Sequence, residues 1–554
     1  MLPDVLPDSG DRRLTGARPS PSFNDAMSKP APRATEAPTL DLVLKRNSIE
    51  RLKREKSPLG ILDELPALIA AGYEDVPEED IVRLKWWGLY HDKPKIGTFM
   101  LRVKIPGGVL QPDQLRAIGE ISNTYGRGEG ELTTRQNVQL HYLELGALPD
   151  VFDRLHAAGL TSAGACGDTV RNITGCPVAG LAHDELFDPT PVLEEAAAFF
   201  YGNPDYSDLP RKHKIAITAC ADACAAPEIN CVALVGAIRD GEEGFGVLVG
   251  GGLSSVPRIA RDLGIWVPKA EAVTVLAAVL DEWREDLRYR VSRVKARLKF
   301  MVDDLGPEGI RQRVERRLDR RFDDFTLPAL PRPSNHLGVH EEWVGVPVHL
   351  GLITGDQLIG LAELGHEVRI TRQQNLVLVG NADVDALAQL GLPVDAGELR
   401  GDAIACTGEP HCNFSVTETK SRMDGLVRLL EDRFPRGSLD GLRLHLDGCP
   451  HACAQHWVGD LGFQGTTVRD DEGKRRQAYD VYLRGSLDRP AAIARPVFRR
   501  VPSDELDDAV VGLVSGWVER RGAGETFRAW CDRTTDDELA ELAGREAARE
   551  RRAA

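Results

Sequence analysis

Two pairs of cysteines in the second half of the chain have spacings that could hold a metal centre. Five residues separate Cys406 from Cys412, three separate Cys449 from Cys453, and 36 residues lie between the pairs. Thiolate sulfur is the protein ligand of structural zinc and of iron-sulfur clusters alike. The four cysteines therefore indicate a site of one of these two kinds.

The five-residue gap favours the cluster over zinc, because zinc sites usually contain pairs separated by two to four residues. A [4Fe-4S] cluster takes four thiolates, which two distant loops at strand ends can supply. Gly408 and Gly448 beside the cysteines would let the backbone come close to such a centre. Buried thiols with no ligand role are a further alternative.

The first half of the chain has five cysteines of its own, in looser pairs: Cys166, Cys176, Cys220, Cys224 and Cys231. For these we favour packing roles, or the remnant of a site that the second half retains.

The chain repeats itself. "LTTRQNVQL" (132–140) matches "ITRQQNLVL" (370–378), and "KIAITACADACAAPEI" (214–229) matches "RLHLDGCPHACAQHWV" (443–458). Each motif recurs in the same order, with a hinge region near 327–338. The sequence thus predicts two related halves with a crevice between them.

Composition limits the class of protein. The 554 residues carry a net charge of -16, which argues against general nucleic-acid binding. We find no apolar run near the roughly 20 residues of a membrane span and no secretion signal, so we expect reduced thiols and a cytoplasmic protein. One basic stretch, 284–322, holds 13 Lys and Arg against 7 Asp and Glu. It is either a solvated helical face or a docking surface for a small acidic partner.

Six motifs in order carry a family resemblance: "FMLRVKIPGG", "LTTRQNVQLH", "GDTVRNITGCPVAG", "LPRKHK", "ACTGEPHCNFSVTETK" and "GCPHACAQHWVGDLGFQG". Over nearly all of 41–530 the chain resembles the siroheme and iron-sulfur nitrite/sulfite reductase family, closest to ferredoxin-dependent assimilatory nitrite reductase. The resemblance implies a [4Fe-4S] cluster on Cys406, Cys412, Cys449 and Cys453, with Cys453 also bridging to the siroheme iron. His451 stands where Asn is common in the family, and it could tune the cluster's reduction potential.

The resemblance also implies the fold: an α+β, pseudo-twofold duplicated nitrite/sulfite reductase fold with two ferredoxin-like halves and two α/β lobes. We expect a disordered tail at 1–40, N-terminal helices and the first ferredoxin-like half at 41–164, and the first siroheme and substrate lobe at 165–330. The second ferredoxin-like half then covers 331–400, and the cluster and siroheme lobe covers 401–554.

The siroheme carboxylates require polar and cationic partners. Period-two geometry would place Thr133, Arg135, Asn137, Gln139 and His141 on one face of a strand, although an ordinary solvent-facing strand has the same pattern. We assign Arg135, Asn137, Gln139 and His141 to siroheme binding, together with Arg372 from the repeated motif.

The substrate anion needs cations of its own. Arg102, Arg171, Lys212 and Lys214 match family positions around the bound oxyanion, whereas each alone would be an ordinary surface cation. Their ammonium and guanidinium groups would also favour protonation of the anion.

No G-x-G-x-x-G fingerprint follows a strand, so electrons must come from a separate carrier. We expect reduced ferredoxin, with a flavoprotein donor as the alternative, and a monomeric enzyme. We predict the six-electron reduction of nitrite to ammonia, because Thr407, Gly408 and "ETK" (418–420) look like the nitrite-reducing branch. Asn413 departs from that branch.

Sulfite reduction to sulfide is the alternative activity, since some sulfite-reducing relatives hold a Cys and a Tyr together near the siroheme. Cys166 and Tyr90 could form such a pair, or simply pack in the core. Two rival classes remain: an enzyme of corrinoid biosynthesis with the same fold, similar to precorrin-3B synthase, and a non-catalytic zinc-binding module.

Overall fold

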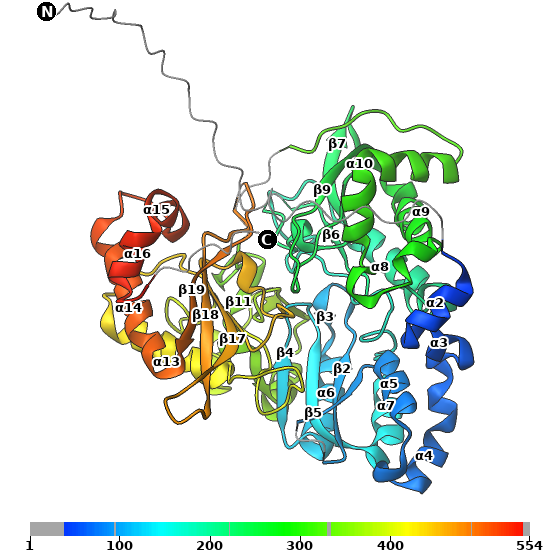
Figure 1. The fold of residues 1–554 in the computed structure, drawn as a ribbon, viewed down its shortest axis with the longest axis horizontal. Helices are drawn as coiled ribbons and strands as arrows, with labels where there is room; N and C mark the ends of the chain where they lie inside the picture. Colours follow the sequence, from blue (N-terminus) through cyan, green and yellow to red (C-terminus); the bar gives the residue numbers. More distant parts are fainter. Residues whose placement is uncertain (1–37, 94–95, 221, 329–333, 489, 547–554) are drawn as a thin grey trace, which may run out of the picture.

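The computed structural model describes residues 38–93, 96–220, 222–328, 334–488 and 490–546. Nearly all of the tail predicted at 1–40 lies outside these ranges. The first elements are four short helices, α2 (Leu40–Arg46), α3 (Ser48–Glu55), α4 (Leu65–Ala71) and α5 (Glu78–Leu84). In Figure 1 they line the lower right side of the molecule.

Two five-stranded sheets form the centre, and each contains a strand from the other half of the chain. The first has the order β1 (Leu89–His91), β2 (Thr98–Val103), β5 (Val138–Glu144), β4 (Glu129–Leu132), β12 (Leu352–Thr354). The second has the order β10 (Gly338–Val339), β11 (Trp343–Val346), β14 (Leu376–Val379), β13 (Val368–Ile370), β3 (Val109–Leu110). Thus β12 completes the first sheet and β3 completes the second, a reciprocal exchange.

The helices that follow the exchanged strands begin in the same way. α6 (Pro112–Tyr125) starts with a capping box between Gln111 and Gln114, and α11 (Gly355–Glu363) starts with one between Thr354 and Gln357. Each box satisfies backbone N–H groups that the first helical turn leaves unpaired. α6 and α11 pack closely, since a Cβ on Gly119 would lie 2.7 Å from the carbonyl oxygen of Gly355.

The repeated "TRQN"-type motifs lock the two halves together. Gln136 donates its side-chain amide to the Ile370 carbonyl at 2.9 Å, and Gln374 donates reciprocally to the Leu132 carbonyl at 2.8 Å. Both glutamines have positive φ, 56° and 66°. We call these two bonds the glutamine clasp.

Two lobes flank this centre, and their sheets repeat one topology. The first lobe has the order β6 (Ile215–Thr218), β7 (Val232–Arg239), β8 (Glu242–Val249), β9 (Arg261–Pro268). The second has the order β15 (Ala403–Ala405), β16 (Leu444–Asp447), β17 (Leu461–Arg469), β18 (Arg475–Leu483), β19 (Arg495–Pro502). The pairs β6–β7 and β16–β17 are parallel, and the later pairs are antiparallel.

Helices cover the outer faces of these sheets. The first lobe carries α8 (Thr190–Phe200), α9 (Ala272–Arg284) and α10 (Leu298–Arg317), and the second carries α13 (Lys420–Arg433), α14 (Leu506–Arg520), α15 (Phe527–Arg533) and α16 (Asp536–Leu542). Figure 1 shows the first lobe at the upper right and the second at the left, with the exchanged sheets between them.

The buried apolar residues form three large clusters. One cluster joins both ferredoxin-like halves, from Ile61 to Leu160 and from Val344 to Leu392, and includes α7 (Leu148–Ala157) and α12 (Val384–Gln389). The other two belong to the lobes. The structure therefore has the predicted duplicated α+β architecture. None of the helices in the described ranges combines the length and apolar character that a membrane span requires.

Replacing Gln374 by Met tests the glutamine clasp. The change leaves the buried Leu132 carbonyl without its side-chain donor, which should cost about 1–3 kcal/mol of unfolding free energy. Urea denaturation measures the loss. The matched control is Gln312→Met on the exposed face of α10, expected within about 0.5 kcal/mol of the parent. Equal unfolding free energies of the two variants would show that the glutamine clasp does not stabilise the protein.

Candidate active site

The second-lobe sheet brings the four predicted ligand cysteines to one edge. β15 and β16 are parallel neighbours, with Ala405 paired to Leu446, so their carboxyl ends meet at the same edge. Cys406 directly follows β15, and Cys449 comes two residues after β16. Cys412 and Cys453 lie in the loops that continue from these two ends.

The four thiols influence one another electrostatically. Burial, then Asp447 and Cys453, raises the pKa of Cys406 well above its usual value. Burial raises the pKa of Cys449 to about 12, and Cys453 and Cys412 add to this increase. A hydrogen bond with the backbone of His451 acts in the opposite direction. No three of these sulfurs lie within 4.8 Å of one another, so they are spread more widely than ligands of one ion. The donor set fits a [4Fe-4S] cluster, whose cysteines bind four different irons.

Backbone details support such a centre. The Gly448 N–H donates to Cys406 Sγ at 3.3 Å, the type of bond that stabilises a cluster thiolate. Glycine is required at 408 and 448 for a different reason than the one predicted. A Cβ on Gly448 would lie 1.9 Å from Ser415 Oγ, and one on Gly408 would lie 2.0 Å from Thr419 Oγ1. Close packing against Ser415 and Thr419, which the sequence did not reveal, is what requires glycine here.

Cys453 is the exposed member of the set, and first-half groups approach it. Thr134 donates its hydroxyl to the Cys453 carbonyl at 2.8 Å. Its sulfur is nevertheless desolvated, and this desolvation and Asp447 raise the pKa of the thiol, whereas Lys212 and Arg102 lower it. Cys453 thus lies where the second lobe meets the cations of the first half.

Three predicted anion-binding residues come together next to the first-lobe sheet. Bridges pair Val170 with His213 and Thr174 with Ala216 in parallel, and the Arg171 N–H donates to the His213 carbonyl at 2.9 Å. This pairing places Arg171 beside Lys212 and Lys214. The Arg171 guanidinium is buried and bonds the carbonyls of Ala165 and Gly167.

Lys212 and Lys214 differ from Arg171, because their ammonium groups make no hydrogen bond or ion pair with any residue that the structure describes. Burial, reinforced by Arg171 and Arg297, lowers the pKa of Lys212 to about 7. Burial and Arg135 hold the pKa of Lys214 well below its usual value. Two adjacent, uncompensated cations of this kind are suited to an anionic ligand.

Arg102, the fourth predicted anion ligand, is held by Gln139. Gln139 Oε1 accepts from Arg102 Nε at 3.0 Å and from Nη2 at 2.5 Å. The Gln139 amide then donates to Glu131 at 3.1 Å, and His141 pairs with Asp92 at 2.9 Å. The carboxylates that flank His141 outweigh its burial and raise the pKa of the imidazole to about 9. Gln139 and His141 therefore belong to a buried network behind Arg102.

The predicted polar strand face at 133–141 is wrong in its first half. Residues 133–137 form a tight turn between β4 and β5, and only Gln139 and His141 lie on β5. The left-handed backbone at Gln136, which positions the glutamine clasp, breaks the alternation. Asn137 accepts from the Ile105 N–H at 3.3 Å, and its repeat counterpart Asn375 accepts from the Val348 N–H at 3.0 Å. The repeated asparagine thus fixes the turn in both halves.

The two remaining predicted siroheme residues are arginines in protein contacts. Arg135 donates to Asn230 Oδ1 at 2.6 Å and bonds the Asn172 carbonyl, and burial lowers its pKa to about 10. Arg372 donates to Gln455 at 2.7 Å and to the Cys224 carbonyl at 3.4 Å. Arg372 therefore joins the two C-x3-C loops, one from each lobe.

Tyr90 and Cys166 do lie together, beside Arg102. Burial raises the pKa of Tyr90 to about 12, and Cys166 adds to the effect through its charge and a hydrogen bond. Arg102 Nη1 donates to Cys166 Sγ at 3.4 Å. The pair thus adjoins an anion-binding candidate.

The sequence did not single out Arg297. This buried arginine donates to Cys231 Sγ at 3.0 Å and contributes to the lowered pKa values of Lys212 and Lys214. Its motif, "KARLKF", carries no distinguishing signal within the basic stretch 284–322.

Much of that basic stretch is neutralised within the protein. Arg290 pairs with Glu50 at 2.8 Å, Arg317 with Glu285 at 2.5 Å, and Arg311 with Asp324 at 2.6 Å. Internal pairing leaves less positive charge for an acidic partner than the sequence count indicates.

A duplicated ferredoxin-like core, with four thiols near lysines that have no partner among the described residues, is typical of a redox protein that binds an anion near a thiolate-held metal centre. Family models support the same class. Residues 91–158 match the nitrite/sulfite reductase ferredoxin-like half domain, and residues 166–322 match the nitrite and sulphite reductase 4Fe-4S domain.

Relatives extend the similarity over the whole molecule. Sulfite reductase [ferredoxin] 2 of Mycolicibacterium paratuberculosis is 36% identical over 89% of this chain and 96% of its own. The assimilatory ferredoxin-dependent nitrite reductase of Haloferax mediterranei is 35% identical over 87% and 90%. The solved structure of the Mycobacterium tuberculosis NirA protein superposes with a TM-score of 0.84 at 35% identity, covering 89% and 97%.

The chain belongs to the nitrite and sulfite reductase family. It is an enzyme of this type, and the family's cofactors are siroheme and a [4Fe-4S] cluster. The non-catalytic zinc-binding alternative is therefore wrong, and the relatives named above are reductases rather than enzymes of corrinoid biosynthesis.

Replacing Cys453 by Ser tests the ligand assignment. We expect iron and acid-labile sulfide to fall by more than half and turnover to be lost, because hydroxyl oxygen is a poor substitute for a cluster thiolate. Metal analysis and the visible spectrum measure the change. Cys531→Ser, at a thiol buried in the core of the second lobe, is the matched control. Retention of a full cluster in the Cys453 variant would refute the assignment.

Lys212 predicts a pH dependence. With a pKa of about 7 the ammonium is charged below pH 7 and neutral above it, so attraction for an anion falls as the pH rises. Nitrite is the suitable probe because it stays a monoanion across this range. KM for nitrite should rise above pH 7, and Lys212→Met should raise KM about tenfold or more at pH 6 and flatten the profile.

Lys212→Arg is the control for this profile, since a guanidinium keeps its charge across the whole range. It should hold KM low above pH 7. If KM for nitrite depends on pH in the Met variant as it does in the parent enzyme, Lys212 does not bind the anion.

Proposed function

We propose that this enzyme catalyses the six-electron reduction of a small oxyanion at siroheme, with sulfite as the preferred anion and reduced ferredoxin as the donor. The observation that carries the anion site is the pair Lys212 and Lys214, two half-buried ammonium groups with no partner among the described residues. A buried charge without a partner is costly, so such a pair is retained where a ligand supplies the opposite charge.

The cofactors would lie where the two lobes meet the central sheets. Cys406, Cys412, Cys449 and Cys453 would hold the cluster, with Cys453 nearest the cations of the first half. Arg135 and Arg372 are the candidates for siroheme carboxylates, because each is a guanidinium, half-buried at Arg135 and buried at Arg372, at a loop that joins different parts of the chain. Siroheme supplies the iron for anion reduction when bound, and the cluster supplies its electrons.

The chain's own residues bind, orient and protonate the anion. Gln139 holds the Arg102 fork by two bonds to one oxygen, which fixes the direction of the guanidinium. Arg171 is fixed by main-chain carbonyls. Lys212, with a pKa of about 7, is matched to giving up a proton near neutral pH.

Tyr90 and Cys166 favour sulfite over nitrite. The resemblance links a neighbouring Cys and Tyr to sulfite-reducing members of the family, and here the two side chains meet beside Arg102. Sulfite also approaches a double negative charge near neutral pH, which suits four clustered cations better than the single charge of nitrite.

Nitrite, the anion that the sequence predicts, is the second candidate. A relative named as a nitrite reductase is 35% identical, almost as similar as those named as sulfite reductases. The residues on which that prediction rested have structural contacts: Thr407 bonds Glu131 at 2.5 Å, and Lys420 bonds the Leu350 carbonyl at 2.6 Å. These contacts fit either activity.

Ferredoxin is the proposed donor because the similar reductases are named for it. We place ferredoxin docking near the Cys412 loop, where Phe414 and Val416 are 56% and 43% exposed. Exposed apolar side chains that lie together can form a protein contact site. Monomeric state and cytoplasmic location stay predictions.

The specificity experiment compares kcat/KM for sulfite and nitrite with reduced methyl viologen as donor. We expect sulfite to be preferred by about tenfold, which corresponds to roughly 1.4 kcal/mol of transition-state binding. Tyr90→Phe should narrow this preference, because it removes the hydroxyl that contacts Cys166. Tyr125→Phe, which loses an exposed bond to Asp150, is the matched control. A preference for nitrite would overturn the sulfite assignment.

A further inference from the structure

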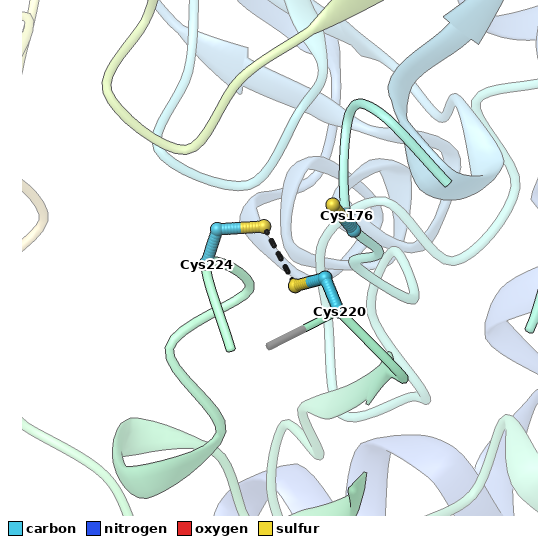
Figure 2. A group of neighbouring side chains, drawn as sticks. All are labelled: Cys176, Cys220 and Cys224. Atoms are coloured by element: carbon cyan, nitrogen blue, oxygen red, sulfur yellow. Dashed lines mark hydrogen bonds between the residues drawn. The ribbon is translucent and has the colours of Figure 1, made fainter. Parts of the chain in front are cut away.

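Three thiols of the first lobe lie closer together than those of the proposed cluster site. Cys176, Cys220 and Cys224 are 4%, 5% and 2% exposed, and all three Sγ atoms lie within 4.8 Å of one another. Cys220 Sγ and Cys224 Sγ are 3.5 Å apart (Figure 2). We call these residues the first-lobe thiol trio.

Strand pairing shows that the trio repeats three of the four cluster positions. Cys220 and Cys449 each come two residues after a strand, β6 or β16, and Cys224 and Cys453 follow four residues later. Thr174 pairs with Ala216 as Ile404 pairs with His445, and the cysteines two residues beyond are Cys176 and Cys406. The turns agree as well, since Ala223 and Ala452 have φ of 48° and 53°.

The fourth position has no thiol. Counting from Cys176 as Cys412 is counted from Cys406, the equivalent residue is Ala182. The other first-half cysteines are engaged elsewhere, Cys166 with Arg102 and Cys231 with Arg297. The first lobe therefore cannot repeat the four-thiolate cluster, and its tighter trio needs a different occupant.

The spacing fits one metal ion. Two sulfurs bound to one tetrahedral zinc at about 2.3 Å are about 3.8 Å apart, close to the separation of Cys220 and Cys224. Sulfurs that bind different irons of a cube lie farther apart, as the four second-lobe thiols do. Thr218 Oγ1, 3.1 Å from Cys220 Sγ, and the apolar side chains of Val178 and Val377 surround the trio.

His336 supplies a candidate for the fourth ligand. The residue is 7% exposed, its Nε2 has no hydrogen-bond partner among the residues that the structure describes, and Cys220 lies within electrostatic reach. Neutral imidazole nitrogen is a common zinc ligand. His336 lies outside the 4.8 Å group, so its side chain would move inward when the ion binds.

We propose that Cys176, Cys220, Cys224 and His336 form a structural zinc site, separate from the siroheme and cluster centre. Zinc binding there joins the two loops of the first lobe to the segment that leads into β10 of the second ferredoxin-like half. The three thiols release their protons on binding, and no electron is transferred. The site is independent of the anion that the enzyme reduces.

Metal analysis of the purified holoenzyme tests the proposal. We expect about one zinc beside about five irons, four from the cluster and one from siroheme. Zinc K-edge absorption should show three sulfurs at about 2.3 Å and one nitrogen at about 2.0 Å. A zinc-free protein with a Cys220–Cys224 disulfide, or with about nine irons and a second cluster, would overturn the proposal.

Variants assign the ligands. Cys220→Ser should lower bound zinc at least about tenfold while iron content stays unchanged, and Cys531→Ser should keep full zinc. If Cys220→Ser fails to fold, His336→Gln, which removes one ligand without touching a thiol, gives the answer through a similar fall in zinc retained against EDTA. Full retention of zinc in His336→Gln would show that His336 is not a ligand. Loss of iron together with zinc in Cys220→Ser would show that the first-lobe thiol trio belongs to the cluster site instead.

Discussion

The reciprocal exchange of strands between the two halves is the constraint on which the rest of the structure depends. β3 is the edge strand of the second sheet and β12 is the edge strand of the first, so neither half forms its complete five-stranded sheet alone. Gln136 and Gln374 tie the same junction from both sides. Because one apolar cluster spans both halves, the central body behaves as a single frame that sets where the lobes attach.

That frame lets each duplicated loop serve a different purpose. The turn after β4 carries Thr134, which reaches Cys453 in the second lobe, and the repeated turn carries Arg372, which reaches both C-x3-C loops. The lobes repeat one topology yet differ in the chemistry at their strand ends. Four spread thiols lie at one end, and cations with a tight thiol trio lie at the other.

Electrostatics follows from this arrangement. Arg135, Arg171, Lys212, Lys214 and Arg297 gather in one partly buried region, and their mutual repulsion adds to burial in lowering the pKa values of the lysines. Main-chain carbonyls hold the guanidinium groups of Arg171 and Arg135, and Gln139 holds that of the neighbouring Arg102, so that the cost of gathering these charges is met during folding. An anionic ligand then meets a preorganised set of charges.

The sequence by itself determined the duplication and the cysteine pairs, since repeated motifs and short spacings are local properties, and its family resemblance implied the α+β class. It also brought Tyr90 and Cys166 together as candidates. Only the tertiary structure decided that Gln139 serves Arg102, that residues 133–137 turn instead of extending, and that Arg297 joins the cations. It alone showed that the basic stretch is largely paired internally. These outcomes depend on contacts between residues tens to hundreds of positions apart, which no local pattern encodes.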